Sequence, residues 1–416
     1  MSLPFLDLRV VESSAFIAAP LAGLTLAQFG ADVIRVEMIG GGIDYGRLPV
    51  MPSGRSLYWT GLNKNKRSIA IDLRRPEGRE LVQNLVTAGG EKGGILLTNI
   101  VTQWLAHGVL AKTRPDVISC TIEGNPDGTT AVDYTVNSAT GYPMITGTGS
   151  PQAPVNHVLP AWDVACAFQA AFAVVSAVER RRRTGQGAEL RIALADVAFT
   201  MLSHLGLTAE AELLDRDRPA IGNYIYGAFG RDFGTRDGAR VIVAAISAGQ
   251  WSALVKACEM EAEIAALERT SKRDFAREAE RYEGREAIAA IIERWCAERT
   301  LADVQKTFDA NRVCWGPYRT TRDLVRHDAR VDLGNPVWER IETAGIGSHL
   351  AAGTPVRAPG EERGASTPAP LLGQHTDEVL HEVLGFDSSS IGRLHDAGIV
   401  AGAESDPTLQ SKSSSN

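Results

Sequence analysis

The chain has 416 residues, of which 44% are hydrophobic and 22% charged, with a formal net charge of −7. A chain of this length buries sizeable cores and forms about two domains. The acidic balance argues against nucleic acid as the main partner, and five scattered cysteines without CxxC spacing argue against a disulfide framework or a metal site. The first residues lack the basic and apolar regions of a signal peptide, so we expect a cytoplasmic protein without a membrane partner.

The first third of the chain predicts alternating strands and helices. The predicted elements are a strand at 6–12, a helix at 20–29, a strand at 31–37, and buried strands at 94–99 and 117–122. Glu37 ends the second strand, where an acidic residue can hold a ribose. The turn at residues 13–20 lacks the glycines that a nicotinamide dinucleotide needs beside its pyrophosphate. The order predicts an α/β fold with a Rossmann-like, doubly wound large domain that lacks the nicotinamide fingerprint.

Polar segments follow two of these strands. The glycines at 40–42 are typical of a flexible turn, but Arg47 lies beyond a strand's carboxyl end, where an arginine can bind a substrate carboxylate. Residues 63–73 place a basic stretch before an alternating strand and, alone, indicate a solvated rim. Residues 133–149 are rich in turn-forming residues and predict a loop over the sheet.

The most apolar segment follows Asp163. Residues 164–178 predict a buried core helix, because the run is short for a membrane span and ends in arginines. Asp163 is placed as its N-cap and Gly185 as its C-terminal stop. The carboxylate has two interpretations: a helix cap, which is common, or a nucleophile or base that the helix dipole ionises in a dry cleft. Spacing alone leaves both open.

The second half of the chain changes character. We expect a helix at 197–214, an aromatic, glycine-rich segment at 216–232, a strand at 240–246 and three amphipathic helices within 250–310. Together they predict a smaller α+β domain at residues 216–325, after a large domain that begins with residues 1–215. Residues 326–403 then return to complete the large domain, through a Pro/Gly-rich excursion at 332–370 and two final helices. The tail at 404–416 is expected to be disordered.

Several segments resemble the family III CoA-transferases, which include formyl-CoA and carnitine-CoA transferases. They are RVVESSAFIAAPLAGLTLAQFGADVIRVE (9–37), NKNKRSIAIDLRRPEG (63–78), LLTNI (96–100), RRRTGQG (181–187) and GQHTDEVLHEVLGF (373–386). The resemblance implies an interlocked homodimer in which the large domain binds coenzyme A and the small domain closes over the acyl group. Coenzyme A enters as part of an acyl-CoA substrate, and neither a resident cofactor nor a metal is expected.

The resemblance also assigns roles to single residues. Asp163 takes the place of the family's nucleophilic aspartate. The expected substrate contacts are Arg47, Ile17, Tyr134, Asn137, His157 and Tyr224, and the expected coenzyme A contacts are Glu37, Met38, Lys64, Lys66, Arg67, Ile71, Asn99 and Ile100. For His157 an ordinary structural hydrogen bond remains the alternative.

Long runs around the predicted cleft are similar to one branch of the family, which moves coenzyme A between the C1 and C4 carboxylates of mesaconate. They include GGGIDYGRLPV (40–50), VDYTVN (132–137), VNHVLPAWD (155–163) and DRPAIGNYIYGAFGRDF (217–233). Formyl-CoA transferases differ from this chain at several positions. Where this chain has Ile17, Met38 and Ile100, they have a glutamine, an arginine that contacts coenzyme A and an aromatic residue, and they have a run of glycines where this chain has residues 244–249. The resemblance therefore does not extend to formyl or oxalyl substrates.

Three alternatives remain open from the sequence. The first is a CoA-transferase that acts between an acyl-CoA and a separate dicarboxylic acid. The second is an α-methylacyl-CoA racemase, which would need a histidine in the loop before Asp163, but the chain has none between His107 and His157. The third is a nucleotide-binding module without catalysis.

Overall fold

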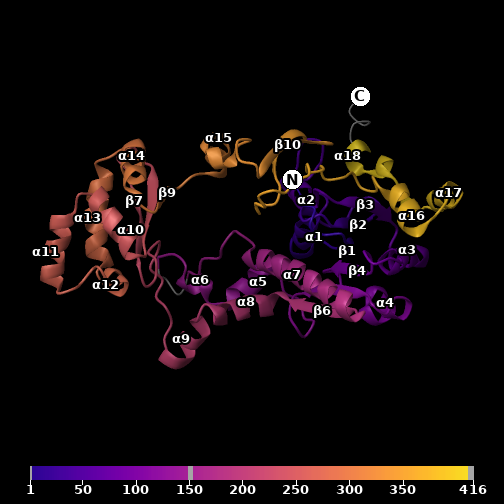
Figure 1. Ribbon diagram of the computed structural model, residues 1–416, viewed down its shortest axis with the longest axis horizontal. Helices are drawn as coiled ribbons and strands as arrows, with labels where there is room; N and C mark the ends of the chain where they lie inside the picture. Colours follow the sequence, from indigo (N-terminus) through magenta and orange to yellow (C-terminus); the bar gives the residue numbers. More distant parts are fainter. Residues whose placement is uncertain (1, 149–152, 411–416) are drawn as a thin grey trace. The chain divides into compact units, whose positions relative to one another are not determined.

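The structure is a computed structural model that describes residues 2–148 and 153–410 (Figure 1). The chain divides into two compact units. Unit 1 comprises Met1–Thr140, His157–Leu214 and Ala329–Asn416, and unit 2 comprises Gly141–Asn156 and Asp215–Asp328. Unit 2 therefore includes Gly141–Asn156, whereas the sequence analysis placed this segment in the large domain.

Unit 1 is built on a seven-stranded sheet in the order β12-β3-β2-β1-β4-β5-β6. The strands are β1 (Arg9–Ser13), β2 (Asp32–Met38), β3 (Arg67–Ile71), β4 (Ile95–Thr98), β5 (Ile118–Glu123), β6 (Ala188–Ala193) and β12 (Val400–Ala401). All pairs are parallel except β12 with β3. The order of the parallel strands is that of a doubly wound fold and reverses between β1 and β4. The predicted α/β fold with a large parallel sheet is confirmed.

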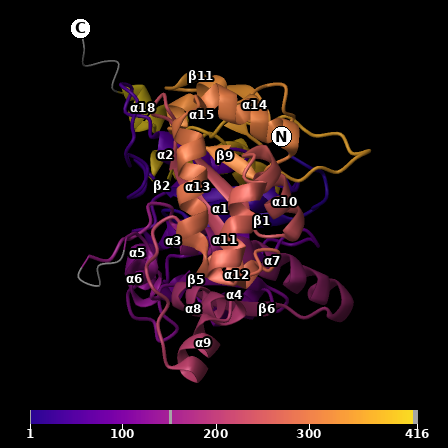
Figure 2. The same ribbon diagram turned by 90° about the vertical axis from the view of Figure 1, so that its left-hand side faces the viewer.

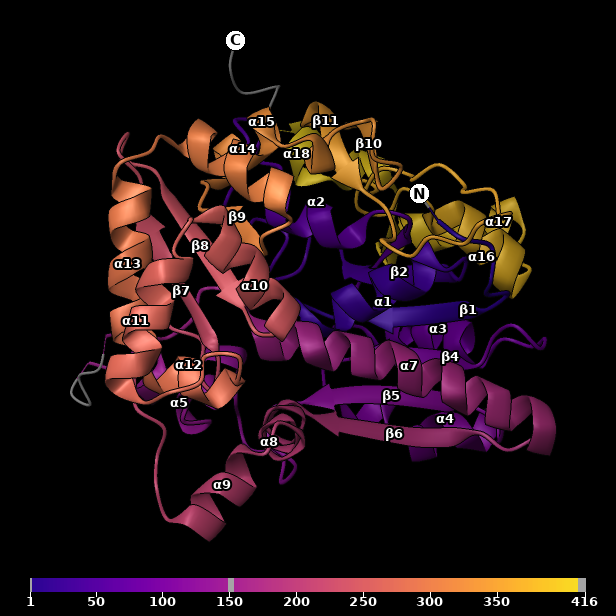
Figure 3. The same cartoon turned by 60° about the vertical axis from the view of Figure 1, so that its left-hand side comes forward.

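Helices cover both faces of this sheet (Figure 3). On one face, α1 (Ala18–Gln28) packs against α7 (Ala161–Thr184), which also contacts β5 and β6. On the other face, α3 (Pro76–Thr87), α4 (His107–Thr113), α16 (Thr376–Leu384) and α17 (Ser388–Asp396) share one core with β1, β2 and β3. Because both ends of the chain contribute to this core, the C-terminal segment is an integral part of unit 1.

Two expectations for the middle of the chain are wrong. Residues 133–149 were predicted as a loop but contain α5 (Asp133–Ala139) and α6 (Tyr142–Ile145). A single helix at 197–214 was predicted, but Gly206 has a φ of +80° and separates α8 (Leu194–His204) from α9 (Leu207–Leu214). Both differences have a local origin, since short helices and single left-handed residues leave little periodic signal. Residues 149–152 lie outside the described residues.

The remaining elements of unit 1 are shorter. They are α2 (Leu57–Asn63), η1 (Gln103–Leu105), η2 (Ala329–Val331), the hairpin strands β10 (Trp338–Thr343) and β11 (Gly347–Ala352), η3 (Ala403–Ser405) and α18 (Pro407–Gln410). The hairpin lies within the excursion at 332–370, for which the sequence shows no clear periodicity.

The expectation of disorder from residue 404 onward is wrong up to residue 410. Asp406 is completely buried and accepts hydrogen bonds from Leu372 N at 2.8 Å and Tyr45 Oη at 2.5 Å. It also pairs with the buried Arg55 at 3.4 Å. A single buried carboxylate, and not an apolar run, anchors this segment, so its polar composition gives no hint of order. Residues 411–416 lie outside the described residues.

Unit 2 combines a small antiparallel sheet with helices (Figure 2). The sheet order is β7 (Phe229–Gly234), β8 (Arg240–Ala245) and β9 (Trp315–Pro317). Besides α6, its helices are α10 (Ala248–Ala257), α11 (Glu261–Ser271), α12 (Glu278–Glu283), α13 (Arg285–Ala297), α14 (Leu301–Asn311) and α15 (Thr321–His327). Five helices therefore occupy the region in which the amphipathic pattern predicts three. Phe229, Trp251 and Phe308 belong to its apolar core.

Candidate active site

A cavity of about 600 Å³ lies in unit 1 at the carboxyl ends of the parallel strands. Its lining residues are Phe16, Ile17, Ala18, Arg47, Tyr58, Asn99, Ile122, Glu123, Gly124, Ala131, Val132, Asp133, Tyr134, Val158, Pro160, Asp163 and Leu194. Segments that follow β1, β4, β5 and β6 all contribute to this wall. Because the strand order reverses between β1 and β4, the loops after these strands diverge and open a crevice, where doubly wound folds bind their ligands.

Asp163 is the third residue of α7, and its half-buried side chain lines this cavity. In the part of the chain that the structure describes, its carboxylate has no hydrogen bond or ion pair. Burial, and then the nearby charge of Asp133, raise the pKa of Asp163 to about 6. At pH 7 about 90% of such a carboxyl is ionised. An anionic, unpaired carboxylate therefore faces the cavity.

The expectation that Asp163 caps its helix is wrong, because Asp133 performs the capping. The N-cap residue of α7 is Pro160, whose side chain makes no cap. Instead, Asp133 Oδ2 accepts hydrogen bonds from the backbone N–H groups of Trp162 at 2.7 Å and Asp163 at 3.1 Å. The C-terminal prediction is confirmed, since Gly185 ends α7 in a left-handed conformation with a φ of 70°. The capping by Asp133 leaves the Asp163 carboxylate free for chemistry.

Asn137 supports the same junction between α5 and α7. Its completely buried side chain accepts a hydrogen bond from Trp162 Nε1 at 3.0 Å. Asn137 is therefore a structural neighbour of Asp163 and does not line the cavity. The spacing of Asp133 and Asn137, which places both on one helical face, is the sequence signal that could have revealed this junction.

Arg47 reaches the cavity from the segment between β2 and α2. Gly40 and Gly41 have φ values of +86° and +95°, and a Cβ on Gly41 would lie 2.9 Å from Tyr45. The turn therefore requires glycine and is more than a flexible linker. The Arg47 guanidinium lies over the rings of Phe16 and Tyr58, at 5.4 and 5.2 Å from their centroids.

Local hydrogen bonds fix the backbone on both sides of this guanidinium. Ser56 caps α2 by accepting from Trp59 N at 3.1 Å, and its hydroxyl donates to Arg47 O at 2.5 Å. Among residues 2–148 and 153–410, no carboxylate forms an ion pair with Arg47. Its positive charge is therefore available to a ligand in the cavity.

The loop after β1 forms the opposite wall. Asn99 holds Ala15 with two hydrogen bonds, from Ala15 N to Oδ1 at 2.9 Å and from Nδ2 to Ala15 O at 2.7 Å. Phe16, with a φ of 63°, donates its backbone N–H to Asp44 Oδ2 at 2.9 Å. The next N–H groups, of Ile17 and Ala18, begin α1 beside the cavity and have no acceptor within the described chain. Unpaired N–H groups at a helix start favour negative charge.

The other predicted substrate contacts lie in different places. Tyr134 lines the cavity, with its hydroxyl 3.4 Å from Val158 O. Both ring nitrogens of His157 are buried without a partner among the described residues, so the alternative of a structural hydrogen bond is wrong for them. Tyr224 belongs to unit 2, where its hydroxyl donates to Glu286 Oε2 at 2.8 Å.

The side chains predicted to contact coenzyme A are mostly engaged inside the protein. Glu37 and Ile71 are buried, Glu37 as the partner of Arg35. Lys66 Nζ contacts Glu12 at 2.9 Å, and burial lowers the pKa of Lys66 to about 8. Met38 ends β2 and is half-buried.

The remaining coenzyme A candidates vary in exposure. Lys64 donates to Ala352 O at 2.9 Å, and burial lowers its pKa. Arg67 is paired with the carboxylates of Asp32, Glu378 and Glu382. Ile100 is 42% exposed beside Asn99, which lines the cavity. The sequence position of these residues did not reveal which of the cations are already paired within the chain.

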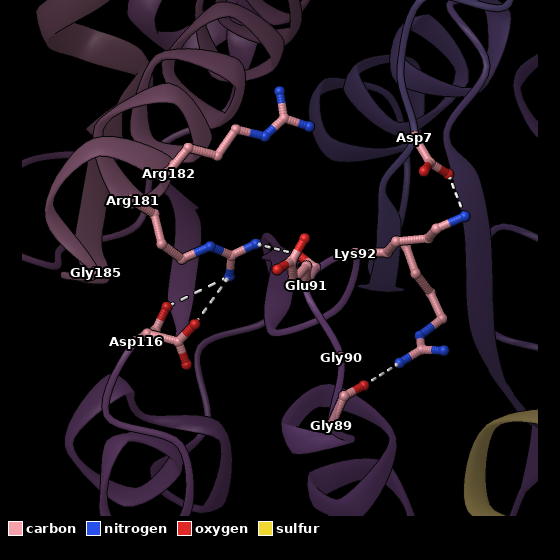
Figure 4. Close-up of a pocket in the computed structure, with 10 residues that line it drawn as sticks. Asp7, Gly89, Gly90, Glu91, Lys92, Asp116, Arg181, Arg182 and Gly185 are labelled. Atoms are coloured by element: carbon pink, nitrogen blue, oxygen red, sulfur yellow. Dashed lines mark hydrogen bonds and ion pairs between the residues drawn. The ribbon is translucent and has the colours of Figure 1, made fainter.

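A second hollow, of about 670 Å³, lies at the opposite edge of the sheet, near the amino ends of the strands (Figure 4). Lys92 pairs with Asp7 at 2.6 Å, and Arg181 Nη2 donates to the backbone oxygen of Glu91 at 3.3 Å. These contacts connect the segments that precede β1 and β4 with the end of α7. Among the described residues, no group of three His, Cys, Asp or Glu side chains is arranged to hold a metal ion.

Comparisons with known proteins identify relatives over most of the chain. The family model "CoA-transferase family III" matches residues 6–376. The chain is 48% identical over 399 residues to 2-methylfumaryl-CoA isomerase of Chloroflexus aurantiacus, with 95% of this chain and 98% of the relative covered. It is 25% identical to a formyl-CoA:oxalate CoA-transferase of Rhodopseudomonas palustris, with 94% and 96% covered. The fold matches a CAIB/BAIF family protein from Brucella suis with a TM-score of 0.74 at 24% identity, covering 92% of this chain and all of that one. The chain belongs to CoA-transferase family III.

Proposed function

We propose that this enzyme isomerises 2-methylfumaryl-CoA to 3-methylfumaryl-CoA by moving coenzyme A from C1 to C4 of one mesaconyl unit. One observation carries the proposal: an unpaired carboxylate, Asp163, and an unpaired guanidinium, Arg47, line the same cavity. The first can attack a thioester, and the second can hold the free carboxylate of a dicarboxylic acyl group. The similarity to 2-methylfumaryl-CoA isomerase supports this substrate.

The transfer proceeds through two covalent states of Asp163. The Asp163 carboxylate attacks the C1 thioester carbonyl, which forms a mixed anhydride and releases the coenzyme A thiolate. The thiolate attacks the aspartyl carbonyl, which forms an aspartyl–CoA thioester and frees mesaconate. The C4 carboxylate of the same mesaconate then attacks that thioester, and the released thiolate attacks the C4 carbonyl and restores Asp163. Each step exchanges one acyl bond for another, so the cycle needs neither ATP nor a net proton transfer.

The second attack requires that mesaconate stays bound and turns over. Arg47 is suited to this task because the rings of Phe16 and Tyr58 limit its motion. Retention makes the second attack intramolecular, and effective molarities reach about 10⁵ M or more for well-aligned groups. An enzyme that releases mesaconate would instead exchange it with the solution.

The backbone donors for the developing oxyanion come from α1 in this proposal. At the start of α7 the N–H groups of Trp162 and Asp163 already donate to Asp133. The unpaired N–H groups of Ile17 and Ala18 line the cavity and are free to donate to a carbonyl oxygen or thiolate.

The cavity must exclude water, because an anhydride hydrolyses. We expect the apolar segment Val158–Trp162 to contribute to this exclusion. Trp162 is 7% exposed, whereas Val158 and Leu159 are 93% and 61% exposed in the single chain.

We also propose that two copies of the chain associate. Phe168 and Phe172 on α7 are 53% and 69% exposed, and none of the residues of α9, all of which are described, is buried. Helix α7 is long and apolar enough to span a membrane by length and composition, but it packs against α1 and the sheet as a core helix does. If a second copy covers this apolar face, the wild type should sediment as a dimer in analytical ultracentrifugation, and Phe172→Glu should shift it to the monomer.

Isotope exchange tests the intramolecular transfer. The enzyme should convert one isomer of the CoA ester into the other in the presence of free ¹³C-labelled mesaconate without incorporating the label. Rapid labelling of the CoA ester pool would favour a transferase that acts on two separate acids. The name of the formyl-CoA:oxalate CoA-transferase describes such a transfer for that relative. Asp163→Asn should abolish turnover in either case.

A further inference from the structure

Asp133 is buried beside the nucleophile in an arrangement that capping alone does not explain. Its side chain is 2% exposed, and Oδ2 alone accepts the two hydrogen bonds from α7. Oδ1 is buried without a hydrogen-bond partner among the described residues. Serine, threonine or asparagine caps a helix without burying a charge, and an unpaired carboxylate oxygen is costly. The acid at this position therefore has a role that depends on its charge.

The surroundings of Asp163 show what this charge acts on. The titratable and charged groups that face Asp163 are Asp133 and Tyr134 from α5, Tyr58 from α2, Cys166 from α7, and Arg47 and Glu123 from the cavity wall. Glu123 is paired with Arg191 at 2.5 Å, which limits its effect. Burial is the main cause that raises the pKa of Asp163, and Asp133 is the other.

We propose that Asp133 is a positioning residue of the transfer: it fixes the backbone of Asp163 and keeps a second negative charge beside the nucleophile. The inference rests on the proposed function. A nearby anion makes the Asp163 carboxylate more basic and thus a stronger nucleophile. The gain applies to the attack by a carboxylate oxygen of Asp163 that begins the transfer in either direction, and the two hydrogen bonds keep the backbone that carries this side chain in place.

Asp133→Asn separates the charge from the hydrogen bonds, because the amide oxygen can still accept from α7. In this variant the acidic limb of kcat/KM should move to lower pH by roughly one unit, and the plateau kcat should fall about tenfold. KM should change little, since the Asp133 side chain is only 2% exposed and the substitution keeps its size. The matched control is Asp127→Asn in the exposed turn before α5, where Asp127 Oδ1 accepts from Thr129 at 2.9 and 2.6 Å. This variant should retain the wild-type pH profile.

Asp133→Ala removes both the negative charge and the hydrogen bonds to α7, so it should also lower the melting temperature. Asp133→Asn should lower the melting temperature less. An unchanged acidic limb in Asp133→Asn would overturn the proposal, because a purely structural cap predicts that result. A melting temperature of Asp133→Asn as low as that of Asp133→Ala would also overturn it, since the charge and the cap would then be inseparable.

A second readout does not depend on turnover. The stability difference between the wild type and Asp163→Asn, measured against pH, reports the titration of Asp163. The midpoint of this difference should fall when both proteins also carry Asp133→Asn. If the wild type failed to isomerise 2-methylfumaryl-CoA, the proposed function would fail, but this midpoint would still decide the role of the Asp133 charge. An unchanged midpoint would reject that role.

Discussion

Replacing the nucleophile should make the protein more stable while it abolishes activity. Burial and Asp133 raise the pKa of Asp163 from the ordinary value of 3.8 to about 6. A carboxyl with a raised pKa binds its proton more tightly in the folded chain, so stability is lost as pH rises from about 4 to 6, and the full penalty remains above pH 6. Asp163→Asn removes the charge at nearly constant size and should relieve this penalty.

The magnitude follows from the two pKa values. Their difference corresponds to at most about 3 kcal/mol at pH 8, and solvent screening of the half-buried group reduces this to about 1–3 kcal/mol. About half of the gain should remain at pH 5, and almost none below about pH 4. Urea denaturation of wild type and Asp163→Asn at pH 5 to 8 measures it, with Asp127→Asn as a control. A variant no more stable than the wild type at pH 8, or a gain that does not shrink as the pH falls, would refute the reasoning.

Three further predictions concern activity, substrate retention and the C-terminal segment. In the wild type, kcat/KM should fall about tenfold between pH 7 and pH 5, as Asp163 becomes protonated with a pKa of about 6; a flat profile to pH 5 would contradict this. Arg47→Ala should lower kcat/KM roughly 10- to 100-fold and release free mesaconate that chromatography detects, with Arg47→Lys as the intermediate case. Asp406→Ala leaves the Arg55 charge buried and unpaired and should cost about 3–5 kcal/mol in urea unfolding; a near-neutral effect would show that the C-terminal segment is dispensable.

The sequence predicts those parts of the molecule that repeat a simple pattern. Alternating apolar residues located the parallel strands of the large sheet. The long apolar run located α7, and the position of Arg47 beyond the end of β2 pointed to the carboxyl edge of the sheet. These features depend on local periodicity and on the geometry of parallel sheets.

Polar pairings between residues that are far apart in the sequence could not be predicted from local periodicity. The bonds from Asp133 to α7 join two helices, and the start of the first has the composition of a turn. The pairing of Lys66 with Glu12 connects β3 to β1, so a cation that reads as solvated is buried. The anchoring of Asp406 by Arg55 spans most of the chain. In each case a specific polar contact, and not an apolar repeat, determines the structure.

The covalent role of Asp163 is tested most directly by mass spectrometry of the protein quenched within milliseconds of mixing with 2-methylfumaryl-CoA. The account predicts that the peptide containing Asp163 carries coenzyme A as a thioester, that hydroxylamine removes it, and that Asp163→Asn carries none. Coenzyme A on another carboxylate, or full turnover by Asp163→Asn, would contradict the account.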